Sequence, residues 1–400
     1  MSASALGVLF VLVTGQVPAL RDDFEALTGP WAVRDEGAQT PIVNRAVAAR
    51  RGNFGVRFVD ESSGSGSGTE SRLARVWPQR PSRIMGRGFF RAGAMSMPSD
   101  HVFFNVNSNF GNGNYSLAAF EFHVPGGGVT NQVFDANGFR ESEDLAGATM
   151  APGEWHLAEL LVEGLGTANG CVKAAFDGVP RHERCGLQLS QAGPPEAIIG
   201  FPWQAPRAAR GSIDADDVAY SESVMASRLV LTPAAVMAKT GECVKVEAAL
   251  ESSWGGAAPA AFDETVPAAP GFATFSDAAC GTAVDGLALV AGTASASVFV
   301  KPLVAGTGSP LAAPLSVMSS GAPSWVVTGE PMGSAPLESS CGCHGAPGGL
   351  ALLVLVLRHR PRTSSARSRP PLGKSAGGGN GRGAEAGDDV RWRRGVAGRG

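Results

Sequence analysis

The chain has 400 residues, of which 44% are hydrophobic and 17% charged, and its formal net charge is −3. That charge is unevenly distributed, because residues 358–400 hold eleven basic and three acidic side chains, which leaves 22 basic and 33 acidic ones elsewhere. An acidic body argues against binding to nucleic acid, and the length allows two domains that each bury a core. The low charge, with abundant Gly, Val, Ala and Phe, favours β structure.

An apolar segment opens the chain. Residues 5–13 read ALGVLFVLV, and the small residues around Val17-Pro18-Ala19 suit a signal peptidase. We therefore expect residues 1–19 to be a cleaved secretion signal and the protein to be exported. The first four residues contain no Lys or Arg, so a misplaced start codon or a core strand remains the alternative.

Residues 20–226 consist of short alternating runs separated by Gly, Asn, Asp and Ser. The clearest runs are 89–92, 101–107, 115–124, 155–162, 172–176 and 213–220. This pattern is typical of antiparallel strands in a sandwich, and no helix of three turns is needed anywhere.

Four short sequences in this region carry a family resemblance. They are DDFE at 22–25, GEW at 153–155, FDG at 176–178 and IDADDV at 213–218. Together they resemble the concanavalin-A-like, laminin-G-like jelly roll of secreted glycan-binding proteins and lyases. The resemblance implies an all-β antiparallel jelly-roll sandwich over residues 20–226, with a polysaccharide or cell-surface glycan as the partner.

A cysteine pair supports the strand prediction independently. Asp177-Gly178 is a hairpin turn signal, and Cys171 and Cys185 lie seven positions on either side of Gly178. A three-residue loop centred on Gly178 would place them opposite one another. We therefore expect a cross-strand disulfide in an exported protein, with two free buried thiols in a cytosolic chain as the alternative.

Two neighbouring runs supply candidate ligand-binding side chains. Strand alternation places Tyr115, Glu121 and His123 on one face of the second run. In the first run His101, Asn105 and Asn107 are expected to share a face opposite the apolar residues; the six side chains form the predicted binding set. Aromatic rings, amides and carboxylates suit sugars, since rings stack on CH faces and polar groups bind hydroxyls. The alternative is an ordinary solvated strand face.

No residue stands out as catalytic. A lyase would recruit His123 or Tyr115 as the base, with Glu121 as its acid/base partner and Arg91 to neutralise a uronate carboxylate. Glu159 and Glu163 are the nearest approach to a glycosidase pair, but Leu161 lies between them on the same strand face. The main interpretation is therefore a non-catalytic glycan-binding or adhesion protein. The alternatives are a polysaccharide lyase or glycoside hydrolase that uses the same face, and a structural cell-envelope protein.

Acidic residues at the two ends of the first domain suggest a cation site. The predicted ligands are Asp22, Asp23, Asp214, Asp216 and Asp217. In jelly rolls the first and last strands commonly run side by side, so these carboxylates could gather around one Ca²⁺ ion. Surface solvation is the competing explanation. The chain has no P-loop, dinucleotide fingerprint or nucleophile elbow.

Residues 228–320 begin a second set of short period-two strands, which suggests a small immunoglobulin-like sandwich. The segments FSDAAC at 275–280, AGT at 291–293 and SVFVK at 297–301 resemble a bacterial immunoglobulin-like module. In that family a cysteine pair closes the module, which implies a disulfide between Cys243 and Cys280. The resemblance also implies a spacer or adhesion role without catalytic residues.

The C-terminal part has three predicted segments. A Ser-, Pro- and Gly-rich linker covers residues 321–340, and the sequence CGCH then precedes ten apolar residues and an Arg cluster. Residues 341–362 resemble a myxobacterial C-terminal sorting signal, which implies a lipid on Cys341 or Cys343, transient inner-membrane association and final attachment to the outer membrane surface. Ten apolar residues are too few to span a bilayer. The alternative is an accidental cysteine pair or a metal site with His344; residues 363–400 are expected to be disordered.

Overall fold

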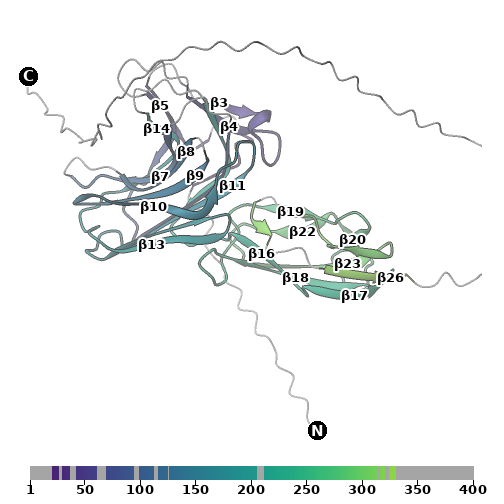
Figure 1. Cartoon of the computed structure of the whole chain (residues 1–400). Coiled ribbons are helices and arrows are strands. Elements are labelled where there is room, and N and C mark those ends of the chain that lie inside the picture. Colours follow the sequence, from purple (N-terminus) through teal and green to yellow (C-terminus); the bar gives the residue numbers. More distant parts are fainter. Residues whose placement is uncertain are drawn as a thin grey trace, which may run out of the picture. The chain divides into compact units, whose positions relative to one another are not determined.

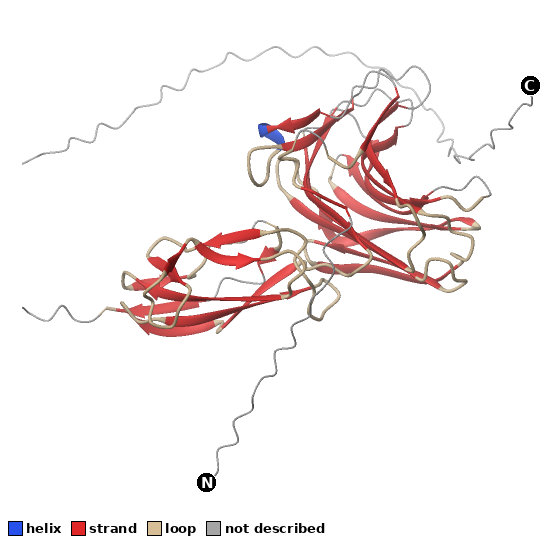
Figure 2. Ribbon diagram, turned by 180° about the vertical axis from the view of Figure 1, so that it is seen from behind, coloured by secondary structure: helices blue, strands red, loops and turns tan. Residues whose placement is uncertain are grey.

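The computed structural model describes residues 20–26, 29–36, 42–60, 69–93, 99–111, 116–124, 126–204, 211–313, 316–319 and 324–329. The predicted secretion signal (1–19), sorting signal with Cys341 and Cys343 (341–362) and basic tail (363–400) lie outside these residues. The described residues form strands and loops apart from one 3-10 turn, η1 (Ala46–Ala48) (Figure 2). None of their helices is long and apolar enough to cross a membrane.

Two antiparallel sheets face each other in the first sandwich (Figure 1). The eight-stranded sheet holds, in order, β13 (Val179–Leu187), β12 (Gly170–Phe176), β11 (His156–Glu163), β6 (Arg83–Ala92), β15 (Gly211–Ser221), β4 (Gly55–Asp60) and β3 (Ile42–Arg45), with β1 (Leu20–Asp22) beside β15. The seven-stranded sheet holds β10 (Gly138–Thr149), β9 (Gly128–Asp135), β8 (Ser116–Val124), β7 (Ser99–Ser108), β14 (Pro195–Gln204), β5 (Thr69–Val76) and β2 (Ala32–Glu36). The predicted antiparallel jelly-roll sandwich is confirmed.

Aromatic side chains fill the space between these sheets. The ring centroids of Phe90 and Phe103 are 5.0 Å apart, and those of Phe90 and Phe104 are 5.1 Å apart. Tyr220 is fully buried and donates its hydroxyl to carbonyl oxygens of Asn105 and Ile198 on the opposite sheet. That burial raises the pKa of Tyr220 well above its usual value. Each fully buried Phe contributes roughly 2–3 kcal/mol to stability, so this layer fixes the position of both sheets.

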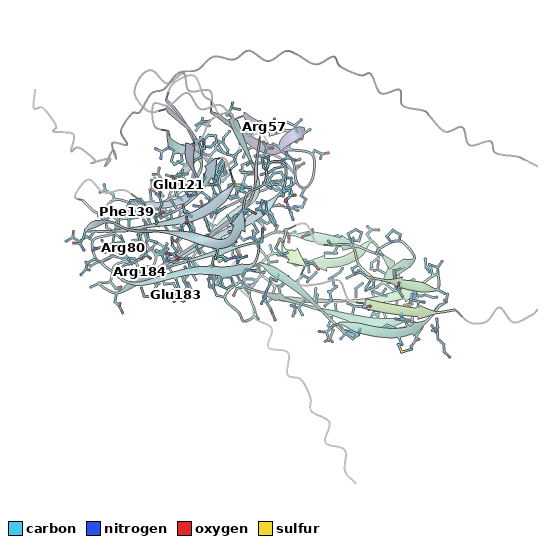
Figure 3. All side chains as sticks on the ribbon, viewed as in Figure 1. Arg57, Arg80, Glu121, Phe139, Glu183 and Arg184 are labelled. Carbon is cyan, nitrogen blue, oxygen red and sulfur yellow. A yellow bond between two sulfur atoms is a disulfide. The ribbon has the colours of Figure 1, made fainter. Side chains whose placement is uncertain are left out.

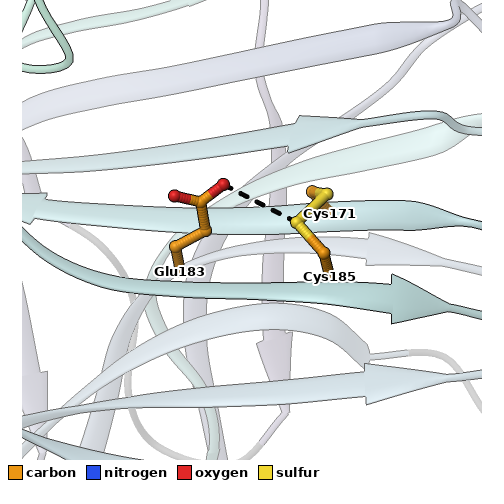
Figure 4. Close-up of side chains that lie close together, drawn as sticks. All are labelled: Cys171, Glu183 and Cys185. Atoms are coloured by element: carbon orange, nitrogen blue, oxygen red, sulfur yellow. Dashed lines mark hydrogen bonds between the residues drawn. A yellow bond between two sulfur atoms is a disulfide. The ribbon is translucent and has the colours of Figure 1, made fainter.

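The β12–β13 hairpin carries the first predicted disulfide. Cys171 pairs with Cys185 across the two strands, and their sulfur atoms are bonded (Figure 4). The turn has two residues rather than three, because Asp177 and Gly178 both have the positive φ angles of a type I′ turn. A bulge in β13 then shifts the register by one residue, which restores the cysteines to opposite positions. The disulfide is confirmed, although its loop differs from the expected one.

A smaller β-sandwich follows the first. Its main sheet holds β21 (Ala283–Val284), β20 (Phe272–Phe275), β23 (Ser295–Pro302), β18 (Val244–Glu251), β16 (Arg228–Thr232) and β25 (Met318–Ser319). Two further sheets hold β17 (Ala235–Lys239), β26 (Ser324–Thr328) and β24 (Gly306–Gly308), and β19 (Glu264–Pro267) with β22 (Gly286–Leu289). The Cys243–Cys280 disulfide is confirmed. Strand β26 lies within the predicted linker (321–340) and pairs with β17, so this part of the linker belongs to the second sandwich. The immunoglobulin-like assignment stays a prediction.

The second sandwich covers part of the outer face of the eight-stranded sheet, and the two sandwiches belong to one compact unit. Met85, Leu161 and Ala219 on that face pack with Met225 and Phe262 in one buried apolar cluster. Strands β6, β11 and β15 are therefore buried on both faces over most of their length. A ligand has no access to this part of the sheet.

Two charged side chains lie inside this contact. Arg87 and Glu159 occupy directly opposite positions on β6 and β11, and both are fully buried. Arg87 donates hydrogen bonds to the carbonyl oxygens of Ala226 and Ser316. Glu159 accepts hydrogen bonds from the hydroxyls of Ser227 and Ser253. All four partners belong to the segment that leads into or forms the second sandwich. Burial lowers the pKa of Arg87 and raises that of Glu159.

The same contact removes Glu159 as a candidate catalytic residue. Its carboxylate lies beneath the second sandwich, whereas Glu163 pairs at 3.2 Å with Lys173 at the strand end. These two carboxylates cannot flank one glycosidic bond, because only Glu163 is accessible.

Replacing Arg87 tests the buried contact. Arg87→Met removes the main positive charge that acts on the buried Glu159, so we expect the free energy of unfolding to fall by about 3–5 kcal/mol. Urea unfolding would measure it. The double variant Arg87→Met/Glu159→Met removes both charges and should recover more than half of that loss. Equal stability of the single and double variants would contradict the pairing.

Candidate functional site

The outer face of the seven-stranded sheet carries the candidate site. Along β8, Phe120 and Phe122 point into the core, so the alternate residues Ala119, Glu121 and His123 lie on the outer face. Figure 3 labels Glu121 on this sheet. The predicted placement of Glu121 and His123 on one face is thus what the structure shows.

Neighbouring strands extend this face in register. Asn105 of β7 lies opposite Ala119, which in turn lies opposite Gln132 of β9. Glu121 lies opposite Thr130 and accepts a hydrogen bond from the Gln132 side chain. Amide, hydroxyl and carboxylate groups therefore follow one another across three strands.

Two polar atoms on this face have no protein partner. Asn105 is 3% exposed and Thr130 is 2% exposed. Within the described part of the chain, Asn105 Oδ1 and Thr130 Oγ1 are buried and form no hydrogen bond. Buried polar groups in native proteins are nearly always satisfied, so these atoms call for a ligand group or a water molecule.

Four residues of this face were missed by the sequence reasoning. Arg72 of β5 lies opposite Gly200 of β14, and Glu196 lies opposite Asn107 of β7. Thr130 and Gln132 are the other two. The signal that could have found them is the alternation of apolar and polar residues in residues 69–76 and 128–135, which predicts two further strands.

An open pocket of about 340 Å³ lies at the β2–β5–β14 end of the sheet. It is lined by Pro30, Trp31, Ala32, Ala74, Arg75, Val76 and Glu196. Because Glu196 is opposite Asn107, the pocket adjoins the polar face.

His101 does not belong to this face, so the prediction that it joins Asn105 and Asn107 there is wrong. A bulge at Phe103 lets two consecutive Phe side chains enter the core and reverses the alternation before it. His101 therefore lies opposite Phe122 with the ring centroids 5.3 Å apart, and it is 1% exposed.

Arg91 is also absent from this face. It lies on β6 of the other sheet, where its Nε is 3.0 Å from Asp214 and its guanidinium lies over the ring of Trp155. It cannot assist Glu121 and His123, so its proposed role beside them is wrong. Tyr115 lies outside the described residues, and Trp77 is buried in the core.

The acidic residues predicted to bind Ca²⁺ are held by other groups. Asp214 pairs with Arg57 at 2.6 Å, and Asp217 pairs with Arg51 at 2.6 Å. Asp216 accepts the backbone N–H groups of Arg50 and Arg51. At the other end of the domain, Asp22 accepts a hydrogen bond from the Trp31 indole, and Asp23 is 3.7 Å from Arg51.

The structure does not assemble these five carboxylates into a ligand set. Within the described residues, the one group of three potential ligands with atoms inside 4.8 Å of one another is Cys171, Glu183 and Cys185 (Figure 4). Its two sulfur atoms form a disulfide. Arginine side chains, backbone N–H groups and the Trp31 indole therefore occupy these carboxylates, and the residues present do not fit a calcium site.

No family model matches the chain, and no curated protein sequence matches it. Among solved structures, it is similar to an endo-β-1,4-glucuronan lyase from the fungus Trichoderma reesei, with 16% identity and a TM-score of 0.43 over 51% of this chain and 95% of that one. An alginate lyase from Pseudomonas aeruginosa shows 17% identity and a TM-score of 0.35 over 43% and 84%. A cellulose-induced protein shows 12% identity and a TM-score of 0.37 over 51% and 97%. The fold assignment rests on the strand order described above.

A calcium titration tests the arginine pairing. We expect the melting temperature to be the same in excess Ca²⁺ and in excess chelator, because Arg51 and Arg57 already neutralise the carboxylates. Differential scanning calorimetry would measure it. A melting temperature several degrees higher in Ca²⁺ would contradict this expectation and support the predicted calcium site.

The burial of Asp216 leads us to expect an unusual pH dependence of protein stability. Burial and the neighbouring Asp217 raise the pKa of Asp216 to about 7, above its unfolded value of about 3.9. The folded state then holds a proton that the unfolded state has released, so stability falls as pH rises between about 4 and 7. Asp216→Asn should reduce this fall by about 1–2 kcal/mol, as measured by urea unfolding at both ends of the range. Asp23→Asn, at a half-exposed position, is the control, and an unchanged slope in Asp216→Asn would contradict the assignment.

Proposed function

We propose that this protein binds an acidic polysaccharide along the outer face of the seven-stranded sheet and cleaves it by β-elimination. The observation that carries the proposal is that Arg72 and His123 share this face with the unsatisfied polar atoms of Asn105 and Thr130. The second sandwich covers the centre of the outer face of the other sheet.

The polar groups of the face match a uronate polymer. Arg72 offers a guanidinium that can hold a carboxylate in two parallel hydrogen bonds. Glu121 and Gln132 offer oxygen and N–H groups for ring hydroxyls, and adjacent strands repeat about every 4.8 Å, close to the length of one pyranose residue. A chain of sugars lying across the strands would meet one set of polar groups per residue.

The chemistry requires a base and a group that stabilises negative charge. His123 would remove the proton from the carbon next to the carboxylate, for which an imidazole is suited near neutral pH. The released electron pair forms a carbon–carbon double bond as the neighbouring glycosidic C–O bond breaks, and the leaving oxygen takes up a proton. Arg72 would stabilise the charge that develops on the carboxylate. It takes the place that sequence reasoning gave to Arg91.

The proposal includes export and attachment to the cell surface. Two disulfides fit an oxidising compartment, and the N-terminal apolar segment suits secretion. Attachment through Cys341 or Cys343 would keep the protein beside an extracellular polysaccharide.

Binding without cleavage is the second candidate. The hydrogen bond between Gln132 and Glu121 favours it, because a carboxylate held in this way serves as a fixed acceptor for sugar hydroxyls. The same face would then act as an adhesion surface.

An assay on uronate polymers separates these functions. We expect the full chain to produce ultraviolet-absorbing unsaturated ends from at least one of glucuronan, polymannuronate, polyguluronate and polygalacturonate. His123→Ala should lower kcat by about a hundredfold or more, and Arg72→Ala should both lower kcat and raise KM. The control is Arg184→Ala, an exposed arginine on β13 of the other sheet.

Each result assigns one function. Cleavage that survives in His123→Ala would contradict the role of the base. Affinity without product would favour the binding protein. If the protein shows neither affinity nor product, the structural envelope role is the function that remains.

A further inference from the structure

We infer that Asn105 determines specificity by accepting a hydrogen bond from one ring hydroxyl of the polysaccharide. This inference rests on the proposed function and names what one part of the same site recognises. Its basis is the direction in which the Asn105 amide is held.

The amide nitrogen of Asn105 is already used within the protein. Asn105 Nδ2 donates to Asn107 Oδ1 at 3.1 Å, two positions along the same strand face. Glu196 lies opposite Asn107 on β14. The hydrogen bond from Nδ2 to Asn107 therefore orients the Asn105 amide.

The atom that Asn105 presents is its oxygen. Asn105 Oδ1 is buried and has no hydrogen-bond partner in the described part of the chain. Its in-register neighbours are Ile198 and Ala119, which are 0% and 3% exposed and carry no polar side-chain atom. A ligand group that donates a proton satisfies this oxygen, whereas a CH group placed there leaves it unsatisfied.

The consequence is a division of roles within the site. An amide carries no charge and cannot neutralise a carboxylate, so that task falls to Arg72. Asn105 instead distinguishes sugars by the direction of a hydroxyl. A site built to bind a hydroxyl rejects the isomer that lacks it there much more strongly than an apolar pocket would, and we expect discrimination of at least about tenfold.

The test uses two polymers that differ in one hydroxyl. Glucuronan and polymannuronate with β-1,4 linkages differ in the configuration of the hydroxyl at C2 and carry the same carboxylate on every sugar. The quantity measured is the ratio of kcat/KM on the two polymers, or the ratio of affinities if no cleavage occurs. A charge introduced at position 105 repels both polymers equally and so cancels in the ratio.

We expect the full chain to show a ratio of at least about tenfold and Asn105→Asp, which keeps an acceptor, to retain it. Asn105→Leu should bring the ratio close to one, and Asn107→Leu should reduce it because the Asn105 amide is then free to turn. Asn169→Leu, at an exposed asparagine before β12, should leave it unchanged.

A tenfold ratio that persists in Asn105→Leu overturns this inference and leaves the proposed function intact. A ratio near one in the unsubstituted protein does the same. Absence of binding to both polymers and to the wider uronate panel overturns the proposed function, and the inference with it. Circular dichroism of each variant confirms that the fold is retained.

Discussion

The buried contact of Arg87 and Glu159 with the second sandwich is the constraint on which the rest of the molecule depends. A pair of charges taken out of water is costly unless hydrogen bonds compensate for the lost solvent, and here the hydrogen-bonding partners come from residues 226, 227, 253 and 316. The second sandwich is therefore an integral cover for the eight-stranded sheet. A free spacer would leave these two side chains with no partners.

That cover decides where a ligand can bind. It closes the centre of one sheet and leaves the outer face of the other, where the polar residues of β7, β8 and β9 lie in register. The buried aromatic layer fixes these strands from below, and Tyr220 ties both β7 and β14 to it through their carbonyl oxygens. Polar groups on the open face are consequently held on rigid strands, which is what recognition of a specific sugar requires.

Simple alternation predicts much of this face and fails at identifiable places. It assigns Asn105, Asn107, Glu121 and His123 correctly, because each lies in an uninterrupted stretch of strand. It fails at His101, since one extra residue in a strand reverses every side chain beyond it and two consecutive Phe residues are the only sequence trace of that bulge. The arginine partners of the acidic residues escape prediction for a different reason. Carboxylate spacing is visible in a sequence, but the arginines that approach from more than 100 residues away are not.

The bulge at Phe103 also sets the number of imidazoles on the open face. With unbroken pairing from Phe104 and Phe120, His101 would lie opposite His123 on the outer face. The observed register places His101 opposite Phe122 instead. Among the described residues of β7 and β8, one histidine is thus left on the outer face, and the other stacks on Phe122 in the core. The packing of two phenylalanines in the core thereby determines which of the two histidine side chains lies on the opposite surface.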